Sequence, residues 1–191
     1  GEKADKLLEQ KELSQERKLL LCQSVKSYYY STMLLDDAGK PRWVTNEGAF
    51  RMMNTLDLAI DHAFFELYYQ PWSVRNQLEG FLEDYSYYDQ CGISFTHDQG
   101  THNVFTAKGT SSYELPDLTD CFSFMSQEQL CNWILLAALY VENTGDIKWA
   151  EEHAAAIGEC LKSMKNRDSM EDNYSGIMSV DSSCCCTGSE I

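Results

Sequence analysis

The sequence predicts an all-α fold on three observations. Five segments repeat apolar side chains at the spacing of amphipathic helices, loops of alternating length separate these segments, and no convincing run of strands is present. Helices joined in this way are typical of antiparallel helix pairs. With 191 residues, the chain has the length of one domain or of a piece of a larger one.

The first helical pattern begins at Ser14, a residue type that caps helix N-termini. Residues 1–13 are polar and charged with little periodicity, and this composition predicts a linker or a frayed helix that arrives from something upstream. The run from Asp36 to Pro41 has the composition of a turn, so we expect the helix to end near Leu35. A short extended stretch over residues 42–45 follows.

Two more helical patterns occupy the middle of the chain. One runs from Met53 to Leu67 and stops at Pro71, and the next starts at Ser73 and reaches Tyr85. Periodicity then disappears over residues 87–120. Long irregular connections are uncommon in compact domains and are often functional.

The last two helical patterns follow this connection. Residues 126–129 read Ser-Gln-Glu-Gln, a capping box with Ser126 as N-cap, and Gly145 closes the helix. Asp146 caps the fifth helix, which we expect to reach Met164 without a break. The tail over residues 168–191 has the composition of a loop.

The charge balance excludes several classes of partner. The chain has 15 Lys and Arg against 30 Asp and Glu, which gives a net charge of −15. Phosphate backbones and anionic membrane surfaces would repel such a chain, so we expect neither nucleic acid nor membrane partners. No apolar run is long enough for a membrane span, and the charged start predicts no signal peptide.

The eight cysteines predict reduced thiols. They form no CxxC pair, and Cys184, Cys185 and Cys186 are adjacent, where disulfides between neighbours are strained. Reduced thiols are typical of the cytoplasm, which is the predicted location. The spacing of a zinc site is missing, so we expect no metal and no other cofactor. A thiol-dependent or metal-binding helical protein using the cysteine cluster remains an alternative.

Three stretches carry a family resemblance. They are WVTNEGAFRMMNTLDLAIDHAFFELYYQPWSVRNQLEGFLEDYSY from Trp43, GISFTHDQG from Gly92, and CFSFMSQEQLCNWILLAALYVENTGD from Cys121. Together they resemble the glycoside hydrolase family 52 β-xylosidases, over about Ser14 to Ile191. A fainter similarity, in the Asn-Glu-Gly, Asn-Thr-x-Asp and His-Asp elements, is to the family 116 β-glucosidases.

The resemblance implies an (α/α)6 toroid, a ring of helices around a central cleft. Such a ring needs roughly 200 to 360 residues, and this chain supplies about five of its helices and a long irregular connection. Residues 14–191 would then be the N-terminal part of the catalytic domain, and residues 1–13 the linker from an upstream β-sandwich. The family's general acid lies in a Thr-Tyr-Asp element that would follow Ile191.

The resemblance also implies the site residues. Glu47, in Asn-Glu-Gly, matches the nucleophile, and we expect Gly48 to let the backbone bend sharply beside it. His97 and Asp98 match a pair that holds sugar hydroxyls. Asp57 matches an acid of the same subsite, although an Asp in the first turns of a helix also interacts favourably with the helix dipole.

The function implied is retaining, exo-acting hydrolysis that releases β-1,4-linked xylose from xylo-oligosaccharides. This chain would supply the nucleophile half of the site, the rest of the catalytic domain would complete it, and a homodimer is compatible with the sequence. Two alternatives stay open: a β-glucosidase of related fold, and a catalytically inert carbohydrate-binding or structural helical fragment.

Overall fold

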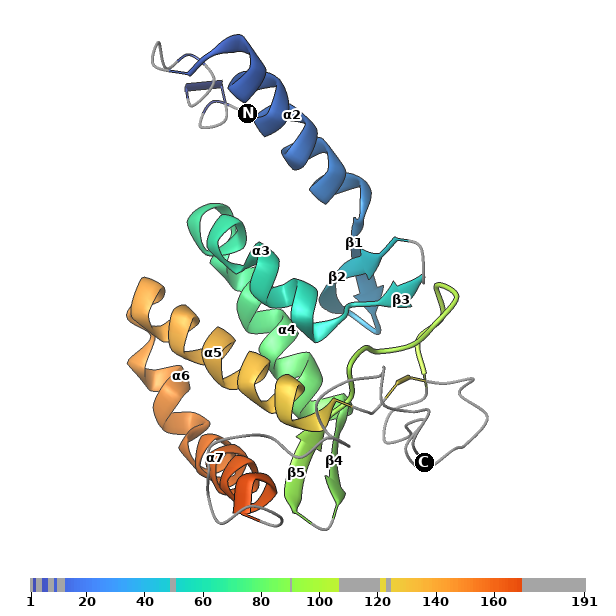
Figure 1. Cartoon of the computed structure of the whole chain (residues 1–191), viewed down its shortest axis with the longest axis vertical. Coiled ribbons are helices and arrows are strands. Elements are labelled where there is room, and N and C mark those ends of the chain that lie inside the picture. Colours follow the sequence, from blue (N-terminus) through green and yellow to red (C-terminus); the bar gives the residue numbers. More distant parts are fainter. Residues whose placement is uncertain are drawn as a thin grey trace.

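The computed structural model of the chain describes residues 2, 5–6, 9, 13–48, 51–89, 91–106, 121–122 and 125–169. Helices predominate in this part of the chain, and a three-stranded and a two-stranded antiparallel sheet accompany them (Figure 1). The expectation of a helical fold is therefore confirmed for the helices. The expectation that the fold is all-α is wrong, because the described residues also form strands.

Helix α2 covers Gln15–Tyr30, and Ser14 caps it by accepting a hydrogen bond from the backbone N–H of Arg17. The helix ends before the predicted Leu35, because the chain continues as strand β1, Thr32–Asp37. The turn at Ala38 and Gly39 has φ values of 52° and 89°. Such left-handed two-residue turns match the twist of paired strands, so the turn composition here belongs to a hairpin and not to a helix end.

Strand β2, Lys40–Glu47, pairs with β1 on one side and with the short β3, Met52–Met53, on the other. The predicted extended stretch over residues 42–45 is thus confirmed as the middle of a longer strand. Its last residue, Glu47, lies opposite Met52. The sheet therefore holds the backbone of Glu47 from a neighbouring strand.

Helices α3, Leu56–Tyr69, and α4, Pro71–Asp84, confirm the second and third helical patterns. Only Gln70 separates them. Pro71 begins α4 and does not merely end α3, because the first helical position needs no backbone N–H donor.

The predicted irregular connection contains a β-hairpin, which corrects the sequence interpretation. Strands β4, Ser86–Asp89, and β5, Gly92–Phe95, pair antiparallel. Asp89 accepts hydrogen bonds from backbone N–H groups in the turn and forms a 2.6 Å ion pair with Arg167. This partner is 78 residues away along the chain. Residues 107–120 of the connection lie outside the described part.

Helix α5, Ser126–Thr144, differs from the prediction at its start and agrees at its end. The N-cap is Met125, in a left-handed conformation, and no side chain caps the helix, so the capping box with Ser126 as N-cap is wrong. Gly145 closes the helix with φ 71°, as expected.

The fifth helical pattern forms two helices. Asp146 caps α6, Ile147–Glu152, by accepting a hydrogen bond from the backbone N–H of Trp149. The chain turns at His153 and continues as α7, Ala154–Ser169. The expected cap is confirmed, and the expected single helix is wrong. Residues 170–191 of the predicted tail lie outside the described part.

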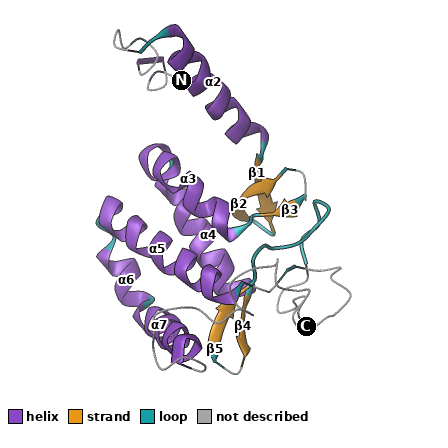
Figure 2. Ribbon diagram, viewed as in Figure 1, coloured by secondary structure: helices purple, strands orange, loops and turns teal. Residues whose placement is uncertain are grey.

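The core lies where α3, α4, α5 and strand β5 meet. The rings of Phe95 and Trp133 stack with centroids 5.2 Å apart, and Trp149 adjoins Trp133. Helices α3 to α7 gather on one side of this core and the sheets lie along the other, while α2 extends away from them beyond β1 (Figure 2). The residues that lead into α3 therefore run beside the sheets, where the candidate site lies.

A buried carboxylate connects four elements. Glu66 of α3 is fully buried and accepts hydrogen bonds from Tyr28 of α2 at 2.7 Å, Trp43 of β2 at 3.1 Å, and Ser73 and Gln77 of α4, each at 2.8 Å. Both carboxylate oxygens are thereby occupied. The network fixes the position of β2, which carries Glu47.

Across the described ranges, no helix has both the length and the apolar character needed to cross a lipid bilayer.

Candidate active site

Glu47 lies at the end of β2 and is partly buried. No residue of the described part forms a hydrogen bond or an ion pair with its carboxylate. A Cβ added at Gly48 would contact nothing within 4 Å, and its φ is outside the left-handed region. The backbone at residue 48 therefore does not require glycine, which differs from the expectation of a sharp bend there.

Three charged neighbours influence Glu47. Burial raises the pKa of its carboxyl group, the negative charges of Asp57 and Asp98 raise the pKa further, and the positive charge of His97 lowers it. Charges act in this way only over short distances in a protein. The structure therefore brings together all four residues that the sequence predicted for the site.

Asp57 and His97 meet across two segments. Asp57 is in the first turn of α3 with its side chain 40% exposed, and its Oδ1 lies 3.9 Å from Nε2 of His97. The backbone of His97 is fixed on both sides: its carbonyl accepts from the N–H of Leu56 at 2.8 Å, and its N–H donates to the carbonyl of Phe122 at 2.7 Å. His97 thus faces the start of α3.

Asp98 is fully buried and has three hydrogen-bond partners. Its Oδ2 lies 3.0 Å from Nδ1 of His97 and accepts from the N–H of Phe122, while Oδ1 accepts from the N–H of Gly100. Asp98 therefore has the position of a residue that orients the His97 ring, and a direct contact with a ligand would need this loop to open.

The protonation of His97 follows from the same contacts. Burial, the largest single influence, lowers the pKa of the imidazole, but the hydrogen bond to Asp98 and the charges of Asp98, Asp57 and Glu47 together outweigh it and raise the pKa. Protonated His97 can donate from Nδ1 to Asp98 and from Nε2 toward Asp57 and the space beside it. In its protonated form, the imidazole is thus a donor between two acids.

Gly100 is the residue that allows this loop to lie so close to β3. Its φ is 144°, and a Cβ there would lie 2.0 Å from the carbonyl oxygen of Val104. Its own carbonyl accepts from the N–H of Met53 at 2.8 Å, and the N–H of Gln99 donates to the carbonyl of Met53 at 2.7 Å. No other residue type fits this backbone conformation without displacement.

Glu128 is a further acid under the charges of the candidate site, and the sequence interpretation did not single it out. It is in the first turn of α5 and partly buried, and burial followed by the charge of Asp57 raises the pKa of its carboxyl group, while the charge of His97 lowers it. Because it is placed in the expected capping box, the sequence predicts only a structural role for it. The signal that could have identified it is an acid at the start of a helix that directly follows a long functional connection.

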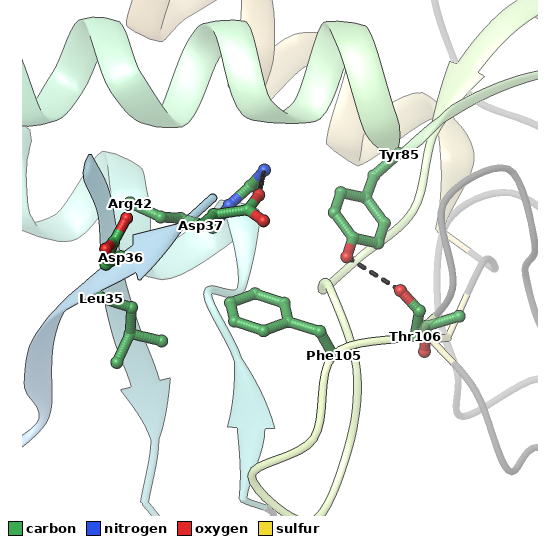
Figure 3. A pocket seen from close by; sticks show the side chains of 7 residues that line it. All are labelled: Leu35, Asp36, Asp37, Arg42, Tyr85, Phe105 and Thr106. Carbon is green, nitrogen blue, oxygen red and sulfur yellow. Dashed lines mark hydrogen bonds and ion pairs between the residues drawn. The ribbon is translucent and has the colours of Figure 1, made fainter. Parts of the chain in front are cut away.

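A separate pocket of about 370 Å³ lies between β1, β2 and the end of α4 (Figure 3). Arg42 points across it, and its NH2 group bonds to Asp37 at 2.8 Å and to Asp84 at 2.7 Å. Tyr85 donates a hydrogen bond to the carbonyl of Thr106. These polar groups are occupied by one another, and the pocket includes none of the predicted site residues.

The thiol alternative finds little support among the described cysteines. Cys22, Cys131 and Cys160 form no disulfide, and burial raises the pKa of Cys160 to about 12, which leaves it an unreactive thiol at neutral pH. Over the described residues, no three His, Cys, Asp or Glu side chains are arranged to hold a metal ion. Cys184, Cys185 and Cys186 lie outside the described part.

Comparisons with known proteins find similarity over most of the chain. A family model described as glycosyl hydrolase family 52 matches residues 1–140. A beta-xylosidase of Geobacillus stearothermophilus is 43% identical over 201 residues, covering 99% of this chain and 28% of that protein. A second beta-xylosidase of the same organism is 45% identical over 192 residues, covering 94% and 31%.

The chain thus spans only about three-tenths of the length of these relatives. The match to the family model nevertheless covers β2 with Glu47, the start of α3 with Asp57, the His97–Asp98 loop and the start of α5 with Glu128. All the residues that meet at the candidate site lie inside it. The chain belongs to glycosyl hydrolase family 52.

Proposed function

We propose that this chain is the nucleophile half of a retaining, exo-acting β-xylosidase that releases β-1,4-linked xylose from xylo-oligosaccharides. One observation carries the proposal: Glu47 is a partly buried carboxylate that has no hydrogen-bond or ion-pair partner among the residues described, and it lies under the charges of His97, Asp57 and Asp98 in a chain of family 52. The beta-xylosidases that the chain resembles support xylose as the sugar.

The activity belongs to a longer protein, since the matched relatives are more than three times the length of the aligned region. In this proposal, residues 14–191 form the N-terminal part of an (α/α)6 toroid, and residues 1–13 join it to an upstream domain. The general acid comes from the remainder of the protein. A xylo-oligosaccharide binds where the two parts meet.

The reaction uses Glu47 as a carboxylate. Its oxygen attacks the anomeric carbon and forms a glycosyl ester, while the bond to the leaving oxygen breaks and the general acid gives that oxygen its proton. Water, deprotonated by the same acid residue in its basic form, then attacks the anomeric carbon and releases Glu47. Two displacements at one carbon return the original configuration.

The neighbours of Glu47 prepare it for this role. His97 favours the ionised carboxylate that must attack, while burial, Asp57 and Asp98 keep the pKa raised, which makes the carboxylate more basic. Nε2 of His97 and the exposed part of Asp57 offer a donor and an acceptor to sugar hydroxyls. Asp98 holds the His97 ring in place.

Trapping the intermediate tests this proposal. A 2-fluoro-xyloside with a good leaving group, given to the full-length enzyme, should leave its mass on the peptide that contains Glu47. Glu47→Ala should lose nearly all activity, and added azide should restore part of it by filling the vacated space. Glu83→Ala, an exposed acid on α4, is the matched control and should stay active. A label on another acid, or an inverted anomer in the product, would exclude Glu47 as nucleophile.

The choice of sugar is tested separately. The full-length enzyme should hydrolyse an aryl β-xyloside with a higher kcat/KM than the matching β-glucoside, which differs by one exocyclic CH2OH group. The reverse preference would support the β-glucosidase alternative.

A further inference from the structure

Asn54 lies between strand β3 and helix α3, and the site described above gives it no role. The residue is only 1% exposed, and its backbone is left-handed with φ 56°. Among residues other than glycine, asparagine is one of the few that adopt this conformation readily. Asn54 opens the Asn-Thr-x-Asp element whose last residue, Asp57, reaches the candidate site.

Asn54 bonds to both backbone polar groups of Thr45, which lies two residues before Glu47. Its N–H donates to the carbonyl of Thr45 at 2.9 Å, and its Oδ1 accepts from the N–H of Thr45 at 3.3 Å. Because the left-handed backbone turns the chain out of β3 here, the side-chain oxygen takes the place of the carbonyl that a continued strand would offer. The side chain thus extends the pairing of β2 beyond the two residues of β3.

The residues on either side of Asn54 hold the other half of the candidate site. The N–H of Met53 donates to the carbonyl of Gly100 at 2.8 Å, and the N–H of Leu56 donates to the carbonyl of His97 at 2.8 Å. Asn54 therefore stands where β2, the start of α3 and the His97 loop join.

Resting on the function proposed above, we propose that Asn54 is a positioning residue for the reaction: its side chain fixes the end of β2 and thereby sets where the Glu47 carboxylate stands in the candidate site. A nucleophile attacks efficiently only when its oxygen is aligned with the anomeric carbon, and a displacement of about 1 Å can cost ~10²-fold in rate. Without the acceptor at Oδ1, the buried N–H of Thr45 loses its bond and the strand end is free to shift. The effect is on the attack by Glu47 and not on the binding of the sugar.

Asn54→Gly separates the side chain from the backbone. Glycine adopts the left-handed conformation freely, so this variant keeps the turn and removes the acceptor oxygen. Ala38→Gly is the matched control, because Ala38 is also left-handed, with φ 52°, but lies exposed in the turn between β1 and β2. Both variants are made in the full-length enzyme, and circular dichroism at the assay temperature verifies that each is folded.

Inactivation by a dinitrophenyl 2-fluoro-xyloside measures the attack separately from binding. We expect Asn54→Gly to lower the inactivation rate constant on the order of 10- to 100-fold, while Ki stays near the wild-type value. Ala38→Gly should match the wild type in both. A wild-type rate constant in Asn54→Gly would overturn the proposal, since only the backbone conformation would then matter. A raised Ki with an unchanged rate constant would overturn it as well, because the side chain would then serve binding.

The pH profile gives a readout that a loss of stability alone does not move. Burial is the largest influence on Glu47 and raises the pKa of its carboxyl group. A strand end that shifts gives this carboxyl group more water, so the acidic limb of kcat/KM should move to lower pH in Asn54→Gly. A limb at the wild-type position would contradict the proposal.

Asn54→Asp is the conservative variant. It keeps an acceptor oxygen for the N–H of Thr45 and tolerates the left-handed backbone, so its inactivation rate constant should lie near the wild-type value. A loss on the order of 10- to 100-fold in this variant as well would contradict the role of Oδ1. The labelled peptide is identified in each protein. A label on an acid other than Glu47 contradicts the proposed function, whereas a label on Glu47 at the wild-type rate in Asn54→Gly contradicts only the role of Asn54.

Discussion

Opposing charges set the protonation of Glu47. Burial raises the pKa of its carboxyl group, the charge of His97 lowers this pKa, and the charge of Asp57 raises it. Because the nucleophile must be ionised, the acidic limb of kcat/KM against pH reports this pKa in the free enzyme. Single neutral substitutions of the two neighbours therefore move the limb in opposite directions.

Asp57→Asn should move the acidic limb to lower pH. The substitution removes a negative charge that disfavours the Glu47 carboxylate, so the pKa of Glu47 falls and the nucleophile stays ionised further into acid. The measurement is a pH profile of kcat/KM for the full-length enzyme on an aryl xyloside. A limb at the wild-type position would show that Glu47 does not control it.

His97→Gln should move the same limb to higher pH, because the carboxylate loses its favourable positive charge and its pKa rises. Its kcat/KM at the plateau should fall as well, since the donor at Nε2 is lost. Opposite shifts in the two variants would be hard to obtain from a general loss of structure. Parallel shifts would contradict the electrostatic explanation.

Asp98→Asn tests whether Asp98 orients His97. The substitution removes the carboxylate whose hydrogen bond and negative charge raise the pKa of His97, while burial still lowers this pKa. The imidazole of His97 should therefore titrate at lower pH in an NMR titration. A raised folded-state pKa gives stability that is complete below the unfolded value and is lost as pH rises through the folded value. The stability difference between wild type and variant should therefore narrow as pH rises through the folded pKa. An unchanged His97 titration would contradict this role.

At the scale of elements, long-range polar contacts fix the strands and helices around the site. Arg167 of α7 forms an ion pair with Asp89 in the β4–β5 hairpin, and both side chains are almost fully buried. Glu66 connects α2, β2, α3 and α4 through four donors. The ion pair holds the hairpin against α7, and the Glu66 network positions β2, and thereby Glu47, relative to the helices.

Glu66→Ala should destabilise the chain by at least ~3 kcal/mol, because it leaves several buried donors without an acceptor at about 1–3 kcal/mol each. The free energy of unfolding is measured by urea denaturation of the 191-residue chain. Glu151→Ala, on an exposed position of α6, is the control and should change it within about 0.5 kcal/mol. A loss no larger than the control's would contradict the network's role.

At the scale of the whole molecule, the chain alone should hydrolyse xylobiose far more slowly than the full-length enzyme. A general acid contributes about 10²–10⁴-fold, and in the proposed function that group lies in the remainder of the protein. The measurement compares the two purified proteins on xylobiose at equal molar concentration. Comparable rates would show that an acid of this chain, such as Glu128, protonates the leaving group.

Part of the fold could be predicted from the sequence. The patterns located α3 and α4 within a few residues, and the caps at Ser14, Asp146 and Gly145 were correct. These features depend on neighbours one to four positions away. Apart from the extended stretch over residues 42–45, the strands were missed, because a short strand that pairs with another segment carries too little local pattern. The first helix, expected to end near Leu35, therefore included the first residues of β1.

The sequence by itself determined which residues were candidates for the site, through motifs around Glu47, Asp57 and the His97–Asp98 pair. Only the tertiary structure decided where these residues lie. Asp98 is buried and bonds to the His97 ring, and Asp57 lies near Nε2 of that ring. Glu128, about 80 positions beyond Glu47 in the sequence, comes under the charges of Asp57 and His97. The physical reason is that charge and burial depend on distance in space, and the contacts that set them join segments far apart in the chain.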